Sequence, residues 1–175
     1  MENLINDIDL IDKVENDACE VKVSVNENTG KDRKMYIESY GCQMNFSDSE
    51  IVTSVMKANG FDTTSDVNEA DVVFLNTCTV TDGADSTCRN LIRKASKHSP
   101  EGKVVVAGCY AQMEADKIKA MQGVDLILGT NEKYKVFDYL DEDEQTQVKI
   151  DKNTEFWGAA TTESDSHTRA FLKIQ

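Results

Sequence analysis

The sequence predicts an α/β domain, a doubly wound and mostly parallel sheet of five strands with helices on both faces. Three observations carry this prediction. Strand-type and helix-type patterns alternate from residue 35 to residue 139. Two of the strands are short apolar runs, which is typical of strands buried on both faces. Glycine and proline stand where the helices should end.

The first elements are a strand over residues 35–40, a helix and a short second strand near Phe61. The Ser-Asp-Ser-Glu run at residues 47–50 has capping-box spelling and predicts the start of that helix, which Gly60 ends.

The remaining elements continue the alternation with three strands and three helices. They are strand 72–75, a helix from Ala84 that Pro100 stops, strand 104–107, a helix through Ile118 and Met121, strand 124–128 and a helix over 131–139. Strands joined in this way favour the flavodoxin-like strand order 2-1-3-4-5.

Composition separates this domain, residues 35–140, from both ends of the chain. Residues 1–34 are acidic and poor in core-forming side chains, so we expect a mobile extension there. Residues 141–175 are expected to be a linker whose last part reads as the beginning of a further domain.

Net charge and hydropathy exclude some classes of protein. A net charge of −13 disfavours binding to nucleic acid by this chain alone. The sequence contains neither an apolar run long enough for a membrane span nor a basic, apolar leader. We therefore expect a cytoplasmic protein with reduced cysteines, which favours metal, redox or core roles for them.

Three of the five cysteines share one position in this pattern. Cys42, Cys78 and Cys109 each follow the carboxyl end of a predicted strand and precede a helix. In the order 2-1-3-4-5 these strands are neighbours, about 4.8 Å apart, so their thiols can meet at one edge of the sheet. Thiolates favour iron–sulfur clusters, zinc or copper(I). A [4Fe–4S] cluster with three cysteine ligands keeps one iron open for chemistry.

The alternative is that these cysteines are ordinary core residues. Loops that follow a glycine, or the polar pair Asn76 and Thr77, are poor places for a core cysteine. A zinc site would need a fourth ligand, and neither His98 nor His167 is expected at this edge.

The other two cysteines are not expected to be ligands. Cys88 lies on an apolar helix stripe with Leu91 and Ile92, which indicates a core residue, and Cys19 lies in the acidic extension. Two further groups of polar residues have a structural and a functional interpretation. Arg89, Arg93 and Lys97 form a helix face that either contacts phosphate or, as we favour, is simply solvated. Asn45, Asn76 and Thr77 either contact a substrate or close turns.

At these residues the sequence resembles the N-terminal domain of the radical S-adenosylmethionine methylthiotransferases. The resemblance covers residues 34–139 and the last eight residues. It rests on Tyr40-Gly41-Cys42-Gln43-Met44-Asn45, Asn76-Thr77-Cys78-Thr79-Val80-Thr81, Gly108-Cys109-Tyr110-Ala111-Gln112 and the stretch from Val124-Asp125 to Gly129.

The resemblance implies that Cys42, Cys78 and Cys109 bind an auxiliary [4Fe–4S] cluster. Its open iron carries sulfur that is delivered as a methylthio group to C2 of a modified adenosine next to the anticodon of tRNA. A second cluster in a central radical domain cleaves S-adenosylmethionine, and a C-terminal module binds RNA.

The sequence departs from the family pattern because it lacks both the Cys-x-x-x-Cys-x-x-Cys motif of the radical domain and the RNA-binding module. Residues 168–175 resemble the stretch just before that motif. We therefore expect an N-terminal piece, without catalytic residues of its own and inactive alone. Its expected partners are tRNA, through the whole enzyme, and a sulfur donor, with no membrane and a monomeric state.

The resemblance also bears on the substrate. Residues 41–45 resemble the branch that acts on isopentenyl-adenosine. Residues 78–81, 88–89, 92–95, 108–112 and 169–175 look more like the threonylcarbamoyl-adenosine branch. The second branch is therefore favoured.

Two rival hypotheses remain. One is a non-catalytic, flavodoxin-like interaction module with buried cysteines. The other is a nucleotide-binding protein, which is disfavoured because the sequence has neither a Gly-x-Gly-x-x-Gly nor a Walker motif.

Overall fold

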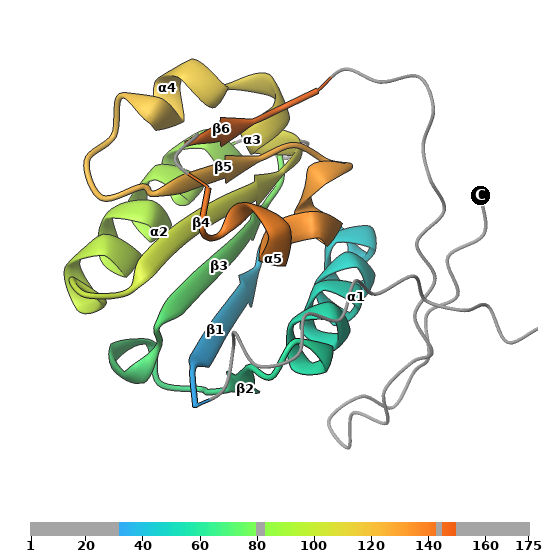
Figure 1. Cartoon of the computed structure of the whole chain (residues 1–175). Helices are drawn as coiled ribbons and strands as arrows, with labels where there is room; N and C mark the ends of the chain where they lie inside the picture. Colours follow the sequence, from blue (N-terminus) through green and yellow to red (C-terminus); the bar gives the residue numbers. More distant parts are fainter. Residues whose placement is uncertain (1–31, 80–82, 143–144, 150–175) are drawn as a thin grey trace, which may run out of the picture.

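A six-stranded sheet forms the centre of the protein, in a computed structural model that describes residues 32–79, 83–142 and 145–149. The strand order is β2-β1-β3-β4-β5-β6 and every neighbouring pair is parallel (Figure 1). The strands are β1 (Lys34–Ser39), β2 (Asp62–Thr63), β3 (Val72–Thr77), β4 (Lys103–Gly108), β5 (Leu126–Leu128) and β6 (Thr146–Gln147).

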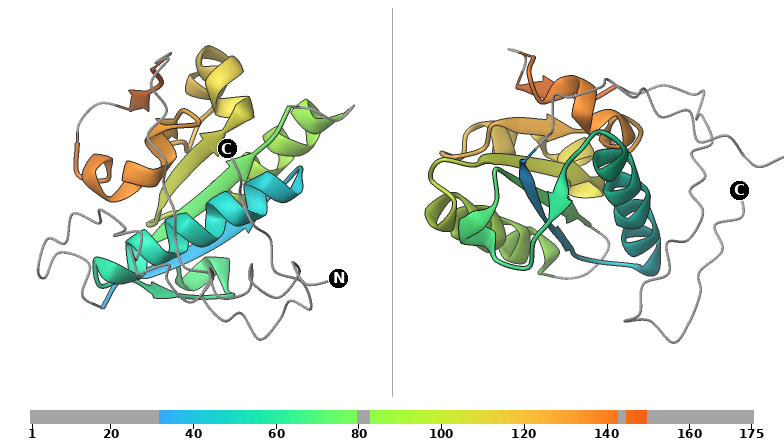
Figure 2. Two further views of the ribbon diagram at one scale, coloured as in Figure 1. Left: turned by 90° about the vertical axis from the view of Figure 1, so that its right-hand side faces the viewer. Right: turned by 60° about the horizontal axis from the view of Figure 1, so that its bottom comes forward.

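Helices cover both faces of this sheet (Figure 2). They are α1 (Gln43–Ala58), α2 (Ala84–His98), α3 (Cys109–Met113), α4 (Ala115–Lys119) and α5 (Val136–Tyr139), with 3-10 turns η2 (Val67–Glu69) and η3 (Glu132–Lys135). Apolar side chains of α1 and α5 pack on one face, and those of α2, α3 and α4 pack on the other. None of the helices within the described ranges is long and apolar enough to cross a membrane.

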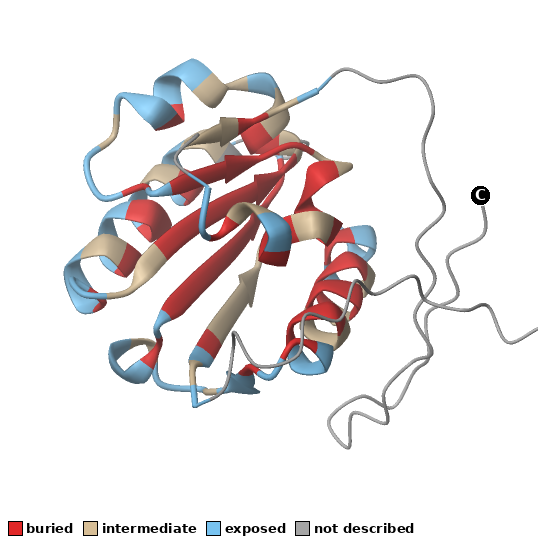
Figure 3. Cartoon of the chain, in the orientation of Figure 1, coloured by how far each residue is buried: buried red, intermediate tan, exposed pale blue. Residues whose placement is uncertain are grey.

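The predicted fold class is confirmed, because all strands run parallel between two helical layers. The first five strands follow the predicted order. Figure 3 shows β3 buried along its whole length, as its apolar sequence predicts. A parallel strand in the middle of such a sheet has helices on both sides and therefore needs apolar side chains on both faces.

The predicted count of five strands is wrong, because β6 adds a sixth. Thr146 and Gln147 pair with Ile127 and Leu128 of β5, within the range that the sequence assigns to a linker. Only two residues long and next to an acidic run, β6 has no periodic signal of its own. It forms because β5 offers it an unpaired backbone edge.

The predicted start of the first helix is also wrong. Helix α1 begins at Gln43, with Cys42 as its N-cap, and the run at residues 47–50 lies inside the helix. The Ser49 hydroxyl hydrogen-bonds the side chains of Ser39 and Asn76 instead of capping a helix. A tertiary contact has taken the place of the predicted local one.

The other boundaries differ less. The helix expected through Ile118 is split at Glu114 into α3 and α4, and the last helix begins as the 3-10 turn η3. The end of α1 at Gly60, which has a φ of +89°, and the end of α2 before Pro100 are as predicted. The expectations for residues 1–31, which include Cys19, and for residues 150–175, which include His167, lie outside the described residues.

Candidate functional site

The three cysteines lie at the same edge of the sheet, at the carboxyl ends of neighbouring strands. Cys42 follows β1 as the N-cap of α1, Cys78 directly follows β3, and Cys109 directly follows β4 as the first residue of α3. These three strands are adjacent in the sheet. We call this side of the sheet, with the turns that follow β1, β3, β4 and β5, the carboxyl edge.

The turn that carries Cys42 lies directly against Cys78. A Cβ on Gly41 would stand 2.2 Å from Cys78 Cβ and 2.9 Å from Cys78 Sγ, so only glycine fits, and its φ of +118° also favours glycine. The Asn45 side-chain amide donates a hydrogen bond of 2.7 Å to the Tyr40 carbonyl oxygen and fixes the same turn. The close approach therefore brings two of the cysteine-bearing segments together.

Cys109 is placed by an equally close approach between β3 and β4. Gly108 has a φ of +100°, and a Cβ there would lie 2.4 Å from the Thr77 carbonyl oxygen. The Thr77 hydroxyl donates a hydrogen bond of 2.7 Å to the Ala107 carbonyl oxygen across the same two strands. Cys78 and Cys109 thus leave the sheet from strand ends that are held tightly side by side.

The three thiols differ in exposure, and Cys42 and Cys78 both act electrostatically on Cys109. Cys42 is exposed, Cys109 is half-buried and Cys78 is only 2% exposed. Burial raises the pKa of the Cys109 thiol, and the negative charges of Cys78 and Cys42 raise this pKa further, whereas the ammonium group of Lys133 opposes the shift. Three thiolates at this edge therefore require a positive charge to accompany them.

The donor set of three thiols suits an iron–sulfur cluster, whose usual protein ligands are cysteine thiolates. Within the described ranges, no group of three or more His, Cys, Asp or Glu side chains is arranged to hold one metal ion. A single zinc needs its ligands within about 2.3 Å of one point, whereas a cluster spreads its cysteine ligands over a wider object. The only described histidine, His98, ends α2 at the opposite edge of the sheet.

Cys88 is a core residue, as predicted. Its side chain is buried with Leu91 and Ile92 between α2 and the sheet. The thiol donates a weak hydrogen bond of 3.7 Å to the Cys78 carbonyl oxygen. Cys88 thus contacts the backbone at the end of β3 from the core and does not join the three edge cysteines.

The polar residues beside the cysteines hold the turns together. Asn45, Asn76 and Thr77 are all buried. The Asn76 amide donates hydrogen bonds of 2.8 Å to the Asn45 carbonyl oxygen and 3.0 Å to the Ser49 hydroxyl, which ties α1 to the end of β3. Of the two interpretations of these residues, the structural one is favoured.

On α2, the predicted cationic face is exposed. Arg89 forms an ion pair of 3.0 Å with Asp85, and Arg93 and Lys97 border a shallow groove toward Gly123. Nothing in these contacts brings the three cations to the carboxyl edge as a group, which agrees with a solvated helix face.

Sequence reasoning missed a buried charged cluster behind the cysteines, formed by Asp48, Lys133 and Tyr134. Lys133 Nζ lies 2.5 Å from Asp48 Oδ2, and the Tyr134 hydroxyl donates a hydrogen bond of 2.7 Å to Asp48 Oδ1. A signal existed, because Asp48 stands on the same helix stripe as Ile51 and Val55. A carboxylate at such a position must find a buried partner.

The fold and the site together define a doubly wound α/β domain that presents three cysteines from adjacent strand ends. The model of the uncharacterized protein family UPF0004 matches residues 34–129, and the chain belongs to this family. This match, together with the curated relatives described next, confirms the resemblance to the N-terminal domain of tRNA methylthiotransferases.

Curated relatives have names from both substrate branches. The chain is 46% identical over 107 residues to a tRNA-2-methylthio-N(6)-dimethylallyladenosine synthase of Flavobacterium psychrophilum. This alignment covers 59% of the chain and 22% of that protein. The chain is 34% identical over 141 residues to the threonylcarbamoyladenosine tRNA methylthiotransferase MtaB of Bacillus subtilis, which covers 77% of this chain and 31% of that protein. The chain thus spans between a fifth and a third of the length of these relatives.

Proposed function

We propose that this chain is the cluster-binding domain of a tRNA methylthiotransferase, with Cys42, Cys78 and Cys109 as the ligands of an auxiliary [4Fe–4S] cluster. The observation that carries the proposal is that three cysteines and, among the described residues, no histidine lie at the ends of three adjacent strands. The names of the relatives supply the reaction class.

In this proposal, the bound cluster supplies an open iron for the sulfur that becomes the methylthio group of the modified adenosine. The chain itself contributes binding and shielding. Gly41 and Gly108 allow the close backbone approaches that place the ligands, and Cys78 is withdrawn from water, while Cys42 remains accessible. In this proposal, the rest of the enzyme binds S-adenosylmethionine and a second cluster and makes the main contacts with tRNA.

For the substrate, we favour threonylcarbamoyl-adenosine, because the motifs around Cys78 and Cys109 resemble those of that branch and the Bacillus relative aligns with 77% of the chain. Dimethylallyl-adenosine is the second candidate, supported by the higher identity of the Flavobacterium relative. A monomeric, cytoplasmic enzyme that receives sulfur from a separate donor fits either substrate.

Anaerobic reconstitution of the chain with iron and sulfide tests the cluster. We expect about four irons per chain, and a visible absorption spectrum like that of other [4Fe–4S] proteins. Replacement of Cys42, Cys78 or Cys109 by serine should abolish stable binding. Cys88→Ser is the matched control, since it changes an equally buried thiol that contacts Cys78 but lies in the core.

A chain that folds but retains no iron would contradict the proposal and favour the rival hypothesis of an interaction module. Iron loss in Cys88→Ser, with loading unchanged in Cys42→Ser, would contradict the assignment of the ligands. The substrate is tested separately by exchanging residues 34–142 into each relative and identifying the methylthiolated adenosine by mass spectrometry. We expect activity to be retained only in the threonylcarbamoyladenosine enzyme.

A further inference from the structure

A buried ion pair lies behind the cysteines and has no part in the function proposed so far. The side chains of Lys133 and Asp48 are only 3% and 8% exposed. Asp48 accepts a hydrogen bond at each oxygen, from Lys133 and from the Tyr134 hydroxyl. The pair joins α1, which begins after Cys42, to η3, which follows the end of β5.

Stability of the fold does not explain why this pair is buried. Removing two charges from water costs several kcal/mol for each ion, and replacing a buried pair by apolar residues of similar volume is often neutral or stabilising. The cluster of aliphatic side chains nearby, which includes Val52 and Leu128, shows that apolar packing is available on this face of the sheet. The charges at this position therefore call for an electrostatic explanation.

Their location provides one. Asp48 precedes Ser49, whose hydroxyl accepts a hydrogen bond of 3.0 Å from the Asn76 amide, two residues before Cys78, so the pair lies close to the end of β3. The positive charge of Lys133 lowers the pKa of Cys109 and the negative charge of Asp48 raises it, with Lys133 the stronger of the two. Gln112 of α3 and Glu132 of η3 also lie side by side, since a Cβ on Gly129 would lie within 2.5 Å of an oxygen of each side chain. The buried Glu132 carboxylate adds a second negative charge beside the pair, which opposes Lys133 as Asp48 does. The segment that bears Lys133 therefore packs against the helix that begins with Cys109.

We propose that the buried ammonium group of Lys133 offsets the negative charge of the three edge thiolates and raises the reduction potential of the cluster they hold, with Asp48 limiting the size of this effect. This inference rests on the proposed function. Charges act strongly here because the surroundings are buried and screening by water and salt is weak. Adding an electron to the cluster adds negative charge, so a nearby cation favours the reduced state and a nearby anion disfavours it.

The experiment is a redox titration of the reconstituted full chain, monitored by electron paramagnetic resonance under anaerobic conditions. We expect Lys133→Met to lower the midpoint potential and Asp48→Asn to raise it. The double variant Lys133→Met/Asp48→Asn removes the pair as a unit and leaves neither of its two charges without the other, so it should fold even if a single variant does not. Its potential should lie below that of the wild type but above that of Lys133→Met, because Lys133 has the stronger effect. Lys34→Met, which removes an exposed lysine at the opposite edge, should leave the potential unchanged.

A purely structural role for the pair would destabilise both single variants without opposite shifts in potential. Unchanged potentials with about four irons per chain would therefore overturn this inference and leave the proposed function intact, as would shifts of the same sign in both single variants. If the single variants do not fold, a double variant with the wild-type potential overturns it. A wild-type chain that binds no cluster would overturn both proposals.

Discussion

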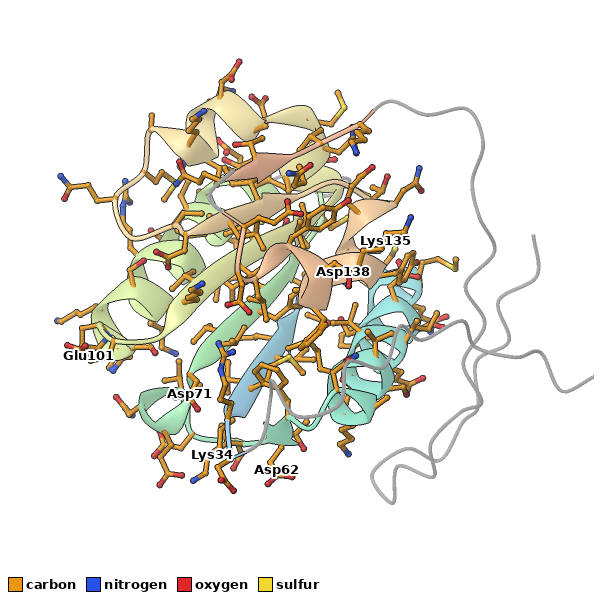
Figure 4. The ribbon with its side chains drawn as sticks, in the orientation of Figure 1. Lys34, Asp62, Asp71, Glu101, Lys135 and Asp138 are labelled. Carbon is orange, nitrogen blue, oxygen red and sulfur yellow. The ribbon has the colours of Figure 1, made fainter. Side chains whose placement is uncertain are left out.

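The two edges of the sheet differ in how far their charged side chains are exposed to solvent. At the amino edge, where the strands begin, Lys34 forms a pair of 2.7 Å with Glu69, and the two side chains are 47% and 56% exposed. Figure 4 shows Lys34, Asp62, Asp71 and Glu101 at this outer side of the molecule. At the carboxyl edge, the pair of Lys133 and Asp48 is almost completely buried.

The difference separates a solvated edge from an edge whose charges are buried and paired. Exposed pairs contribute little because water and salt screen them. These pairs tolerate substitution. The polar residues of the amino edge keep that edge soluble and form its short turns. Buried polar groups usually need hydrogen-bond partners, and most of those in the described ranges lie at the carboxyl edge: Asn45, Asp48, Ser49, Asn76, Thr77, Glu132 and Lys133. Two of their oxygens, Asn76 Oδ1 and Glu132 Oε2, have no such partner among the described residues. Burying so many polar groups lowers the stability of the fold, and the function proposed for this edge gives a reason to keep them.

The largest effect that tests this comparison is expected from Asp48→Ala. The substitution leaves the Lys133 ammonium group buried without its carboxylate, which should lower the free energy of unfolding by about 3–5 kcal/mol. Urea denaturation at neutral pH measures the change. Glu69→Ala removes the partner of Lys34 at the amino edge and should leave the unfolding midpoint nearly unchanged. Equal losses in the two variants would show that the edges do not differ.

A smaller effect is expected from Gly108→Ala at the carboxyl edge. The new Cβ would lie 2.4 Å from the Thr77 carbonyl oxygen, at a φ of +100° that alanine rarely adopts. Strain of this kind costs about 1–3 kcal/mol, and the displaced backbone should also weaken iron binding at Cys109. Gly83→Ala is the matched control, because Gly83 has a φ of +83° but a Cβ there would meet nothing closer than 3.9 Å. If both variants lose the same stability and both retain iron, the close approach of β3 and β4 is unimportant for the site.

The smallest effect concerns Tyr40, which follows β1 just before Gly41. A hydrogen bond to Glu38 is the main cause that raises the pKa of Tyr40 to about 12, with burial adding to the shift. Because the folded pKa is raised, the associated stability is present below pH 10 and is lost as the pH rises toward 12. Ultraviolet titration of tyrosinate in the wild type and in Tyr40→Phe identifies this transition. Glu38→Gln should return it toward pH 10, and an unchanged transition in Glu38→Gln would rule out the hydrogen bond as the cause.

Much of the fold could be predicted because its signals are local. A few consecutive residues are enough to predict some elements. Examples are the apolar runs of β3 and β4 and the apolar stripe of α2 that contains Leu91 and Ile92. The start of α1 could not be predicted in this way. The Ser-Asp-Ser-Glu run has the spelling of a cap, and only the folded chain directs Ser49 toward Ser39 and Asp48 toward Lys133.

By itself, the sequence determined the alternation of strands and helices, the strand order of the first five strands and the meeting of Cys42, Cys78 and Cys109 at one edge. Strand topology turns positions far apart in the chain into neighbours, so the recurrence of cysteine after three strands was sufficient. The tertiary structure alone decided the pairing of Asp48 with Lys133, the burial of Cys78 beneath Gly41 and the sixth strand. Each of these depends on contacts between segments that lie far apart in the sequence, and no local pattern names the partner. The strength of a charge–charge interaction depends on burial, because it is weak until the folded chain has excluded water.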